Sequence, residues 1–222
     1  MNPLLRTIRI LVITALIFNN FPCTAQQSTQ DSTKAKEFGM RHIIAPAVLT
    51  AGGTLLTYEP NLNRFNVAIR DRVQSDNHSP FHIDDVFQYV PAGSAYLLKL
   101  CGMESKSTYK ELTKRTALSY LATAATVLTL KHTTHILRPD GTRYNSFPSG
   151  HTATAFVGAE ILRREYGEQY PYIAVAGYTV ATGVGLMRIY NNRHWAGDVL
   201  AGAGLGILCA GLSYLISPYL TF

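Results

Sequence analysis

Long apolar stretches separated by short polar connections cover most of the chain beyond residue 41. Three of them reach the roughly 20 residues that a membrane-spanning helix needs, and three are shorter. The six stretches lie at about 42–58, 86–101, 115–137, 150–165, 170–190 and 195–217. No apolar–polar alternation of the kind that marks a strand competes with this pattern. The pattern therefore predicts an all-α fold, a bundle of six helices.

Glycine recurs along the last apolar stretch, where it would let neighbouring helices approach closely. The residues are Gly197, Gly202, Gly204, Gly206 and Gly211. The 222-residue chain is 47% hydrophobic and only 15% charged, whereas an average soluble domain is roughly 25% charged. This composition suits one domain and argues against a disordered chain, a coiled coil or a collagen-like fibre.

The first 25 residues have the layout of an export signal. Arg6 and Arg9 precede an apolar core, Ile10–Phe18, that is too short to span a membrane. Cys23–Ala25 has the small-x-small form of a cleavage site, and an uncleaved anchor is the alternative. The predicted organisation is a signal peptide or N-terminal anchor at 1–25, a polar linker at 26–41 and one domain at 42–222.

The positive charge of the chain is modest and dispersed. Twenty Lys and Arg against 14 Asp and Glu give a net charge of +6. Because there is no lysine-rich run, we expect no nucleic-acid partner, and the excess fits an anionic ligand or an anionic membrane surface. Three cysteines are too few for a disulfide framework, and no Cys/His or carboxylate cluster predicts a metal ion or another cofactor.

Two clusters of polar residues flank the connection between the third and fourth apolar stretches. Lys131 and Arg138 are seven residues apart, about two helical turns, so both would project from one helix face before Pro139 ends the helix. Ser149-Gly150 then opens the next apolar stretch. Ser149 is a good N-cap, and Gly150 lets backbone N–H groups at the positive end of a helix approach a ligand.

Two histidines stand close to these elements. His151 would lie in the first turn after Gly150, facing the same site. His194 and Asp198 are four residues apart and would be neighbours on one helix face. A carboxylate there can fix the imidazole tautomer and leave the other ring nitrogen as a free lone pair, as a nucleophile or base requires.

Helix order predicts that these clusters meet. Lys131 lies near the end of the third stretch, Ser149 at the start of the fourth, Arg188 at the end of the fifth and His194 at the start of the sixth. If consecutive helices are antiparallel, all four places fall at one end of the bundle. Three cations, two histidines and a helix N-terminus would then surround a tetrahedral oxyanion such as phosphate.

The three blocks resemble a known family. The pattern Lys-x6-Arg-Pro over 131–139, Pro-Ser-Gly-His over 148–151 and Arg-x5-His-x3-Asp over 188–198 is similar to that of the type 2 phosphatidic acid phosphatases (PAP2) and vanadium haloperoxidases, with their six-helix fold. The overall pattern looks like that of small bacterial lipid phosphatases of the lipid A 4′-phosphatase type. One residue departs from the family pattern, since Met187 stands where the family has a serine.

The resemblance implies a role for each residue. Lys131, Arg138 and Arg188 would neutralise the phosphoryl oxygens, with hydrogen bonds from Ser149 and the Gly150 backbone. His194 would attack phosphorus and form a phosphohistidine, with Asp198 orienting it. His151 would protonate the leaving oxygen. The reaction needs no metal or cofactor.

Charge asymmetry predicts an orientation in the membrane. The connection between the second and third stretches is rich in lysine, whereas the one before it carries five acidic residues. By the positive-inside rule the predicted site faces the periplasm, from the bacterial inner membrane. We therefore expect a phosphorylated lipid as substrate, such as lipid A, polyprenyl pyrophosphate or a phosphatidyl phosphate, with membrane lipids as partners.

Three alternatives remain open at this stage. A cleaved signal would leave residue 26 outside, although the first stretch should start inside, so a soluble periplasmic acid phosphatase of the same family is the main alternative. A vanadate-dependent haloperoxidase would use the same residues to hold vanadate. A non-catalytic lipid-binding protein would not need His151 together with the His194–Asp198 pair.

Overall fold

The structure, a computed structural model, describes residues 41–74, 79 and 81–220. All of them belong to one compact unit, Phe38–Phe222. The regular secondary structure of the described part consists of helices, in line with the predicted all-α fold. Its α-helices are α2 (Arg41–Tyr58), α3 (Pro60–Val73), α4 (Asp84–Phe87), α5 (Val90–Leu100), α6 (Tyr109–Thr134), α7 (Gly150–Tyr166), α8 (Pro171–Tyr190) and α9 (Ala196–Ile216). The predicted signal or anchor, and the linker up to its last residue, lie outside the described residues.

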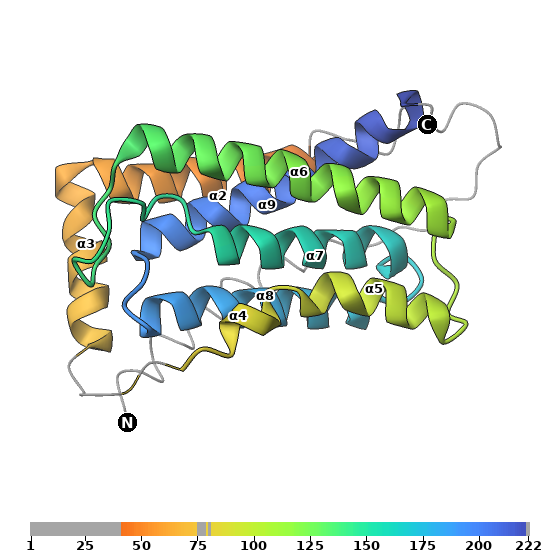
Figure 1. Cartoon of the computed structure of the whole chain (residues 1–222), viewed down its shortest axis with the longest axis horizontal. Coiled ribbons are helices and arrows are strands. Elements are labelled where there is room, and N and C mark those ends of the chain that lie inside the picture. The colour runs from red at the N-terminus through yellow and green to blue at the C-terminus, as the bar shows by residue number, and fades with distance from the viewer. Residues whose placement is uncertain (1–40, 75–78, 80, 221–222) are drawn as a thin grey trace. The chain divides into compact units, whose positions relative to one another are not determined.

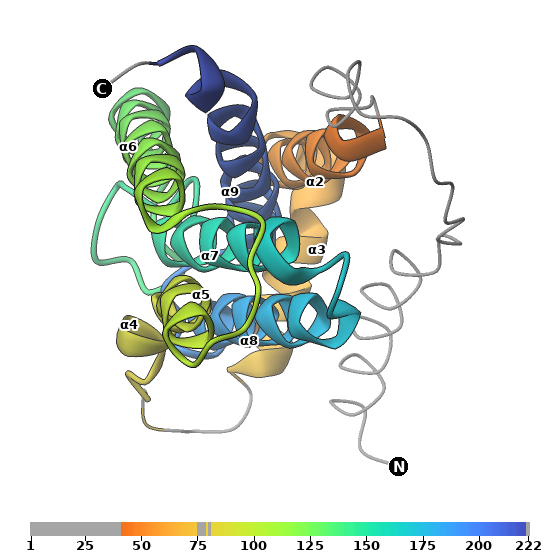
Figure 2. The same cartoon turned by 90° about the vertical axis from the view of Figure 1, so that its right-hand side faces the viewer.

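Helices α2 and α5 to α9 correspond to the six apolar stretches, and α7 lies in their middle. Figure 2, viewed along the bundle, shows α6, α9 and α2 on one side of α7 and α5 and α8 on the other. The closest packing is between α9 and α2, and α7 packs closely against both α8 and α9. Consecutive long helices run in opposite directions, so the chain passes repeatedly between the two ends of the bundle (Figure 1).

The glycines of α9 allow backbone-to-backbone contact, as predicted. A Cβ added at Gly204 would come within 2.4 Å of the Pro46 carbonyl oxygen in α2. A Cβ at Gly206 would come within 2.3 Å of the Ala153 carbonyl oxygen in α7. Real Cβ atoms do not approach this closely, so α9 can lie between α2 and α7 only because these positions have no side chain.

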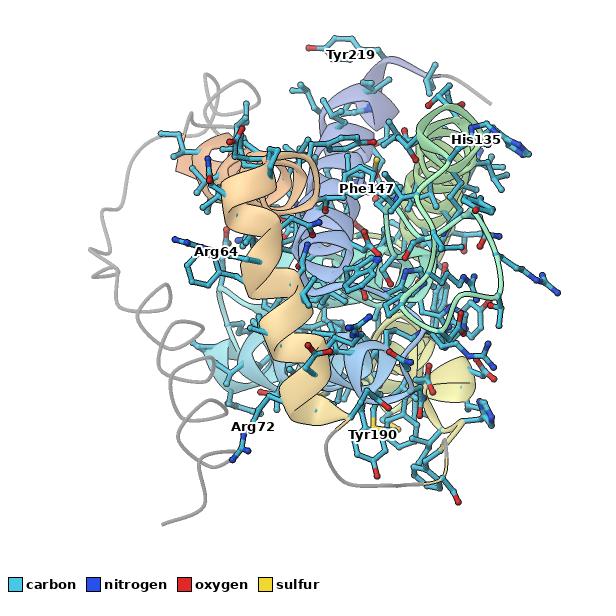
Figure 3. All side chains as sticks on the ribbon, turned by 90° about the vertical axis from the view of Figure 1, so that its left-hand side faces the viewer. Arg64, Arg72, His135, Phe147, Tyr190 and Tyr219 are labelled. Carbon is cyan, nitrogen blue, oxygen red and sulfur yellow. The ribbon has the colours of Figure 1, made fainter. Side chains whose placement is uncertain are left out.

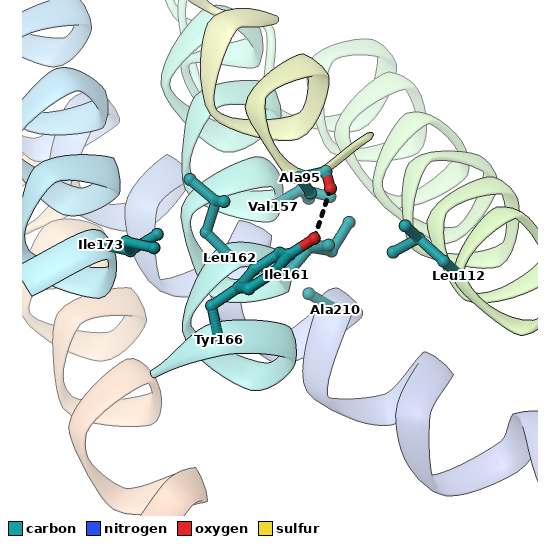
Figure 4. Close-up of a cluster of buried hydrophobic side chains, with 8 residues drawn as sticks. All are labelled: Ala95, Leu112, Val157, Ile161, Leu162, Tyr166, Ile173 and Ala210. Carbon is teal, nitrogen blue, oxygen red and sulfur yellow. Dashed lines mark hydrogen bonds between the residues drawn. The ribbon is translucent and has the colours of Figure 1, made fainter. Parts of the chain in front are cut away.

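The hydrophobic core lies where α5, α6, α7, α8 and α9 meet. Figure 4 shows its buried side chains, which are Ala95, Leu112, Val157, Ile161, Leu162, Tyr166, Ile173 and Ala210. The buried Tyr166 hydroxyl donates a hydrogen bond of 2.7 Å to the Ala95 carbonyl oxygen, so its polar group is satisfied inside an apolar cluster. This core stands away from the predicted site residues and anchors the opposite half of the bundle.

Helix α3 was not predicted, and it crosses the end of the bundle where the predicted site residues lie (Figure 1). The buried Asn66 side chain fixes it there. Its Nδ2 donates to the Leu56 carbonyl at the end of α2, and its Oδ1 accepts from the Gly197 N–H in the first turn of α9, both at 2.9 Å. One side chain thus satisfies the free backbone groups of two helix ends.

Two of the predicted helices differ from those observed. The second stretch, predicted at 86–101, is divided into α4 and α5. The third, predicted at 115–137, begins at Tyr109 because Thr108 and Glu111 form a capping box that starts the helix earlier. It ends at Thr134 because His135 adopts a left-handed conformation, with φ 48°.

Two helices in the described part, Pro171–Tyr190 and Ala196–Tyr219, are long and apolar enough to cross a membrane. This is a statement about length and composition. Large apolar side chains are also exposed along α2, α5 and α6, among them Val48, Leu97 and Leu121.

Candidate active site

Four helix ends meet beside α3. They are the C-terminal ends of α6 and α8 and the N-terminal ends of α7 and α9, joined by the loops 135–149 and 191–195 (Figure 1). Figure 3 looks onto this end and shows Phe147 among these elements. The Phe147 ring packs edge-on against Tyr58 of α2, with 5.7 Å between ring centroids. The loop before α7 is therefore held against the end of α2.

The first cluster has a different local structure from the predicted one. Lys131 lies in the last turn of α6, and its Nζ donates hydrogen bonds to the carbonyls of Asn145 and Ser146, at 2.5 and 3.3 Å. Arg138 was expected on the same helix face, but α6 has already ended and Arg138 lies in the following loop. It still stands within electrostatic reach of both Lys131 and Arg188.

Arg138 is only partly exposed and has unused hydrogen-bonding capacity. Its Nε is buried and has no hydrogen-bond partner among the described residues. Burial lowers the pKa of the Arg138 guanidinium, and the nearby charge of Arg188 lowers it further. The Arg138 and Arg188 guanidinium groups, which lie within electrostatic reach of each other, favour the binding of an anion.

Ser149 occupies the predicted N-cap position of α7, but its side chain does not cap the helix. Its buried hydroxyl accepts a hydrogen bond of 2.9 Å from the Thr152 hydroxyl, and its backbone N–H donates to the Asp198 carbonyl at 3.0 Å. Gly150 begins α7, and a Cβ there would lie 4.0 Å from Lys131 Cε. The start of α7 is thus hydrogen-bonded to α9 and lies beside the Lys131 side chain.

His194 is 3% exposed and precedes α9, whose first residue is Ala196. The expectation that His194 and Asp198 share a helix face was therefore wrong in detail, since only Asp198 is helical. Its Oδ2 lies 3.5 Å from His194 Nδ1 and accepts hydrogen bonds from the Ser146 hydroxyl and the Trp195 N–H. His194 Nδ1 has no hydrogen-bond partner within the described chain.

The environment of His194 favours its neutral form. Burial lowers the pKa of the imidazole to about 4, although Asp198 acts in the opposite direction. The charges of Lys131 and Arg188 lower the pKa as well. At neutral pH, His194 is therefore an uncharged imidazole beside a carboxylate and close to cations. Such a group can act as a nucleophile towards an anion that those cations hold.

The predicted site residues thus lie together at one end of the bundle. Comparison with known proteins shows that residues 132–222 match the model of the PAP2 superfamily. This stretch of the chain is similar to that superfamily. The match includes the second and third sequence blocks, and Lys131 directly precedes it.

Two curated relatives are lipid A 1-phosphatases. That of Porphyromonas gingivalis is 40% identical over 205 residues, which cover 88% of this chain and 46% of the relative. That of Helicobacter pylori is 39% identical over 75 residues, or 34% of this chain and 37% of the relative. The chain matches less than half the length of either curated relative.

Two crystal structures share the fold. LpxE of Aquifex aeolicus is 26% identical with a TM-score of 0.53, and the match covers 67% of this chain and 94% of that one. A transmembrane PAP2-type phosphatidylglycerolphosphate phosphatase of Bacillus subtilis is 22% identical with a TM-score of 0.58, over 80% and 98% of the two chains. The second likeness concerns the fold alone.

The candidate site also includes residues that the sequence did not single out. Arg188 is 6% exposed, and its Nη1 forms a salt bridge with the buried carboxylate of Asp84. His151 is half-buried, and its Nε2 lies 2.8 Å from Asp85 Oδ1. Asp84 and Asp85 precede the family match by some 50 residues and carry no motif. Only their contacts in the folded chain reveal them.

Two carboxylates and an imidazole in this part of the site are residue types that can bind a metal ion. Ligand atoms of Asp84, Asp85 and His151 lie within 4.8 Å of one another. Arg188 Nη1, however, contacts Asp84 and stands 3.7 Å from Asp85 Oδ1, so a guanidinium already neutralises this cluster. The two carboxylates thus already interact with a cationic side chain, and His151 is hydrogen-bonded to one of them.

Proposed function

We propose that this chain is a membrane phosphatase that removes the 1-phosphate from lipid A through a phosphohistidine intermediate. The observation that carries this proposal is the buried, neutral His194 beside Asp198, within electrostatic reach of Lys131 and Arg188. The names of the two curated relatives support lipid A as the substrate and position 1 rather than position 4′.

In the first step, the His194 nitrogen that faces away from Asp198, Nε2, attacks phosphorus. A P–N bond forms and the bond from phosphorus to the lipid oxygen breaks. The electron pair of that bond goes to the lipid oxygen, which takes a proton from His151. Asp198 stabilises the positive charge that develops on His194.

In the second step, water attacks the phosphohistidine while His151, now neutral, takes a proton from the water. The P–N bond breaks and inorganic phosphate leaves. Lys131, Arg138 and Arg188 balance the charge on the phosphoryl oxygens in both steps, and the Ser149 hydroxyl and Gly150 N–H add hydrogen bonds. Phosphoryl transfer depends chiefly on such positioning and charge stabilisation.

We further propose that the site end of the bundle faces the periplasm. Positive charge at the opposite end supports this orientation, since Lys99, Lys106, Lys110 and Arg115 all lie between the end of α5 and the first turns of α6. The positive-inside rule assigns such an end to the cytoplasm. Labelling of single-cysteine variants in intact cells with a membrane-impermeant reagent tests the orientation.

The test of function is phosphate release by the purified full chain in detergent. The substrates are lipid A bearing a 1-phosphate, lipid A bearing only a 4′-phosphate, a polyprenyl pyrophosphate and soluble p-nitrophenyl phosphate. We expect preference for the 1-phosphate, inhibition by vanadate and full activity in excess EDTA.

Three other outcomes would contradict, in turn, the proposed substrate, the metal-independent mechanism and the phosphohistidine intermediate. Preference for the soluble ester, together with release from cells without detergent, would favour the periplasmic acid phosphatase. EDTA inhibition reversed by Mg²⁺ would contradict the metal-independent mechanism. Full activity of His194→Ala would overturn the phosphohistidine step.

A further inference from the structure

Residues 81–89, which include α4, approach the candidate site from outside the sequence blocks that define it. The side-chain amide of Asn191, in the loop between α8 and α9, both accepts a hydrogen bond from this segment and donates one to it. Its Oδ1 accepts a hydrogen bond from the Phe81 N–H, and its Nδ2 donates to the Phe81 carbonyl, each at 2.9 Å. The same Nδ2 lies 3.1 Å from Asp84 Oδ1. These bonds fix the position from which α4 enters the site.

Asp84 is 0% exposed, and its two carboxylate oxygens have separate partners. Oδ1 accepts from Asn191, whereas Oδ2 forms the salt bridge with Arg188 Nη1. A buried carboxylate needs such partners, and a buried guanidinium needs them equally. Arg188 Nε remains without a partner among the described residues, so the guanidinium keeps a donor for a further acceptor.

The neighbouring carboxylate, Asp85, is hydrogen-bonded to the imidazole of His151. Its Oδ1 accepts a hydrogen bond from His151 Nε2 at 2.8 Å, with the imidazole as donor because a carboxylate only accepts. The charged groups that face His151 are Asp85 and Asp84 from α4 and Arg188 from α8. Burial and Arg188 favour the neutral imidazole and lower the pKa of His151, and the two carboxylates act in the opposite direction.

We propose that Asp84 and Asp85 are positioning residues of the phosphatase, Asp84 fixing Arg188 for the phosphoryl group and Asp85 orienting His151 as the acid for the leaving group. The proposal rests on the function proposed above. It gives the site two carboxylate–imidazole pairs, Asp198 with the nucleophile His194 and Asp85 with the acid His151.

The two aspartates are expected to fail in different ways. Loss of the Asp85 carboxylate weakens proton donation, which matters for a sugar hydroxyl leaving group and little for p-nitrophenolate, which leaves without a proton. Loss of the Asp84 carboxylate leaves Arg188 misplaced, which weakens phosphoryl binding whatever the leaving group is. The choice of substrate therefore separates the two roles.

The experiment compares Asp84→Asn, Asp85→Asn and the control Asp71→Asn in the full chain, with phosphate release from lipid A 1-phosphate and from p-nitrophenyl phosphate. Asp71 is an exposed residue of α3 whose carboxylate pairs with its neighbour Arg70. We expect Asp85→Asn to lower kcat/KM, which covers the steps up to formation of the phosphohistidine and not its hydrolysis, at least tenfold on the lipid and less than about threefold on the aryl ester. The alkaline limb of its pH–rate profile should move to lower pH by about one unit.

For Asp84→Asn we expect losses of about tenfold or more on both substrates, and vanadate inhibition weakened by a similar factor. In an Arg188→Ala background, the same change should add less than about twofold. Asn191→Ala serves as the second variant if Asp84→Asn does not fold, because it removes a partner of Asp84 without leaving Arg188 unpaired. It should weaken vanadate inhibition in the same direction.

The proposal is overturned if Asp85→Asn lowers kcat/KM equally on both substrates, or if the Asp84 and Asn191 variants match Asp71→Asn in rate and in vanadate inhibition. These outcomes differ from a failure of the proposed function. In that case the unmodified chain itself would release no phosphate from the lipid or the ester.

Discussion

Replacement of Gly202 by alanine tests whether the packing of α9 sets the geometry of the site. Gly202 lies inside α9, one turn beyond Asp198, and its Cα faces the carbonyl of Ser149. An added Cβ would stand 2.6 Å from that oxygen, whereas ordinary van der Waals contact begins at 3.4 Å. The two backbones must therefore separate by about 0.8 Å, the difference between these two distances.

This separation has a predictable cost for catalysis. Ser149 is the N-cap of α7, so its displacement moves Gly150 and His151 relative to His194. A misplacement of about 1 Å in a catalytic site can lower the rate by about 10²-fold. We expect Gly202→Ala to lower kcat/KM on lipid A 1-phosphate by about 10- to 100-fold while the protein still folds, since overpacking costs about 1–3 kcal/mol.

The matched control is Gly183→Ala in α8. Gly183 also lies inside a long helix, but a Cβ added there meets nothing within 4 Å. Both substitutions gain the same helix propensity, so the difference between them isolates the contact with Ser149. Phosphate release and size-exclusion elution are measured on both variants. A Gly202→Ala enzyme with the kcat/KM of Gly183→Ala would refute the reasoning.

The remaining predictions concern His194 and its neighbours. His194→Ala should lower kcat about 10³-fold or more on every substrate, with no phosphohistidine trapped by a denaturing alkaline quench, under which the P–N bond is stable. Ser146→Ala removes a hydrogen bond to Asp198 and should lower kcat about tenfold, with little change in KM. Because the pKa of His194 is about 4 in the folded chain and about 6.5 when unfolded, its contribution to stability is complete above pH 6.5 and is lost as the pH falls towards 4. Thermal unfolding between pH 4 and 8 should show this loss, up to about 3 kcal/mol, and it should be absent in His194→Ala.

Sequence pattern was sufficient to locate α2 and α5 to α9, because each of these helices is formed by an apolar stretch of the chain. Helix α3 was missed because polar and charged residues such as Asn63, Arg64 and Arg70 give it no apolar stretch. The early start of α6 was detectable, since Thr108 and Glu111 have the spacing of a capping box. The end of α6 was not, because nothing in the residue type of His135 demands its left-handed conformation.

The motif residues could be proposed from spacing because helix order brings helix ends together. Their supporting partners could not. Asp84 and Arg188 are 104 residues apart, and Ser146 and Asp198 are 52 apart. An aspartate in a polar connection has the same appearance whether it faces solvent or a buried arginine. Only the folded backbone, held at this point by Asn191, decides between the two.

The stretch that matches the family model is not a self-contained folding unit. It begins at residue 132, yet the helix against which α9 packs most closely, α2, lies upstream of that point. The carboxylate that neutralises Arg188 lies upstream as well. A fragment starting at residue 132 would carry the nucleophile but would expose the glycine-lined side of α9 and a bare arginine. Chimaeras with relatives should therefore exchange the chain from α2 onward, so that α9 stays with α2 and Arg188 stays with Asp84.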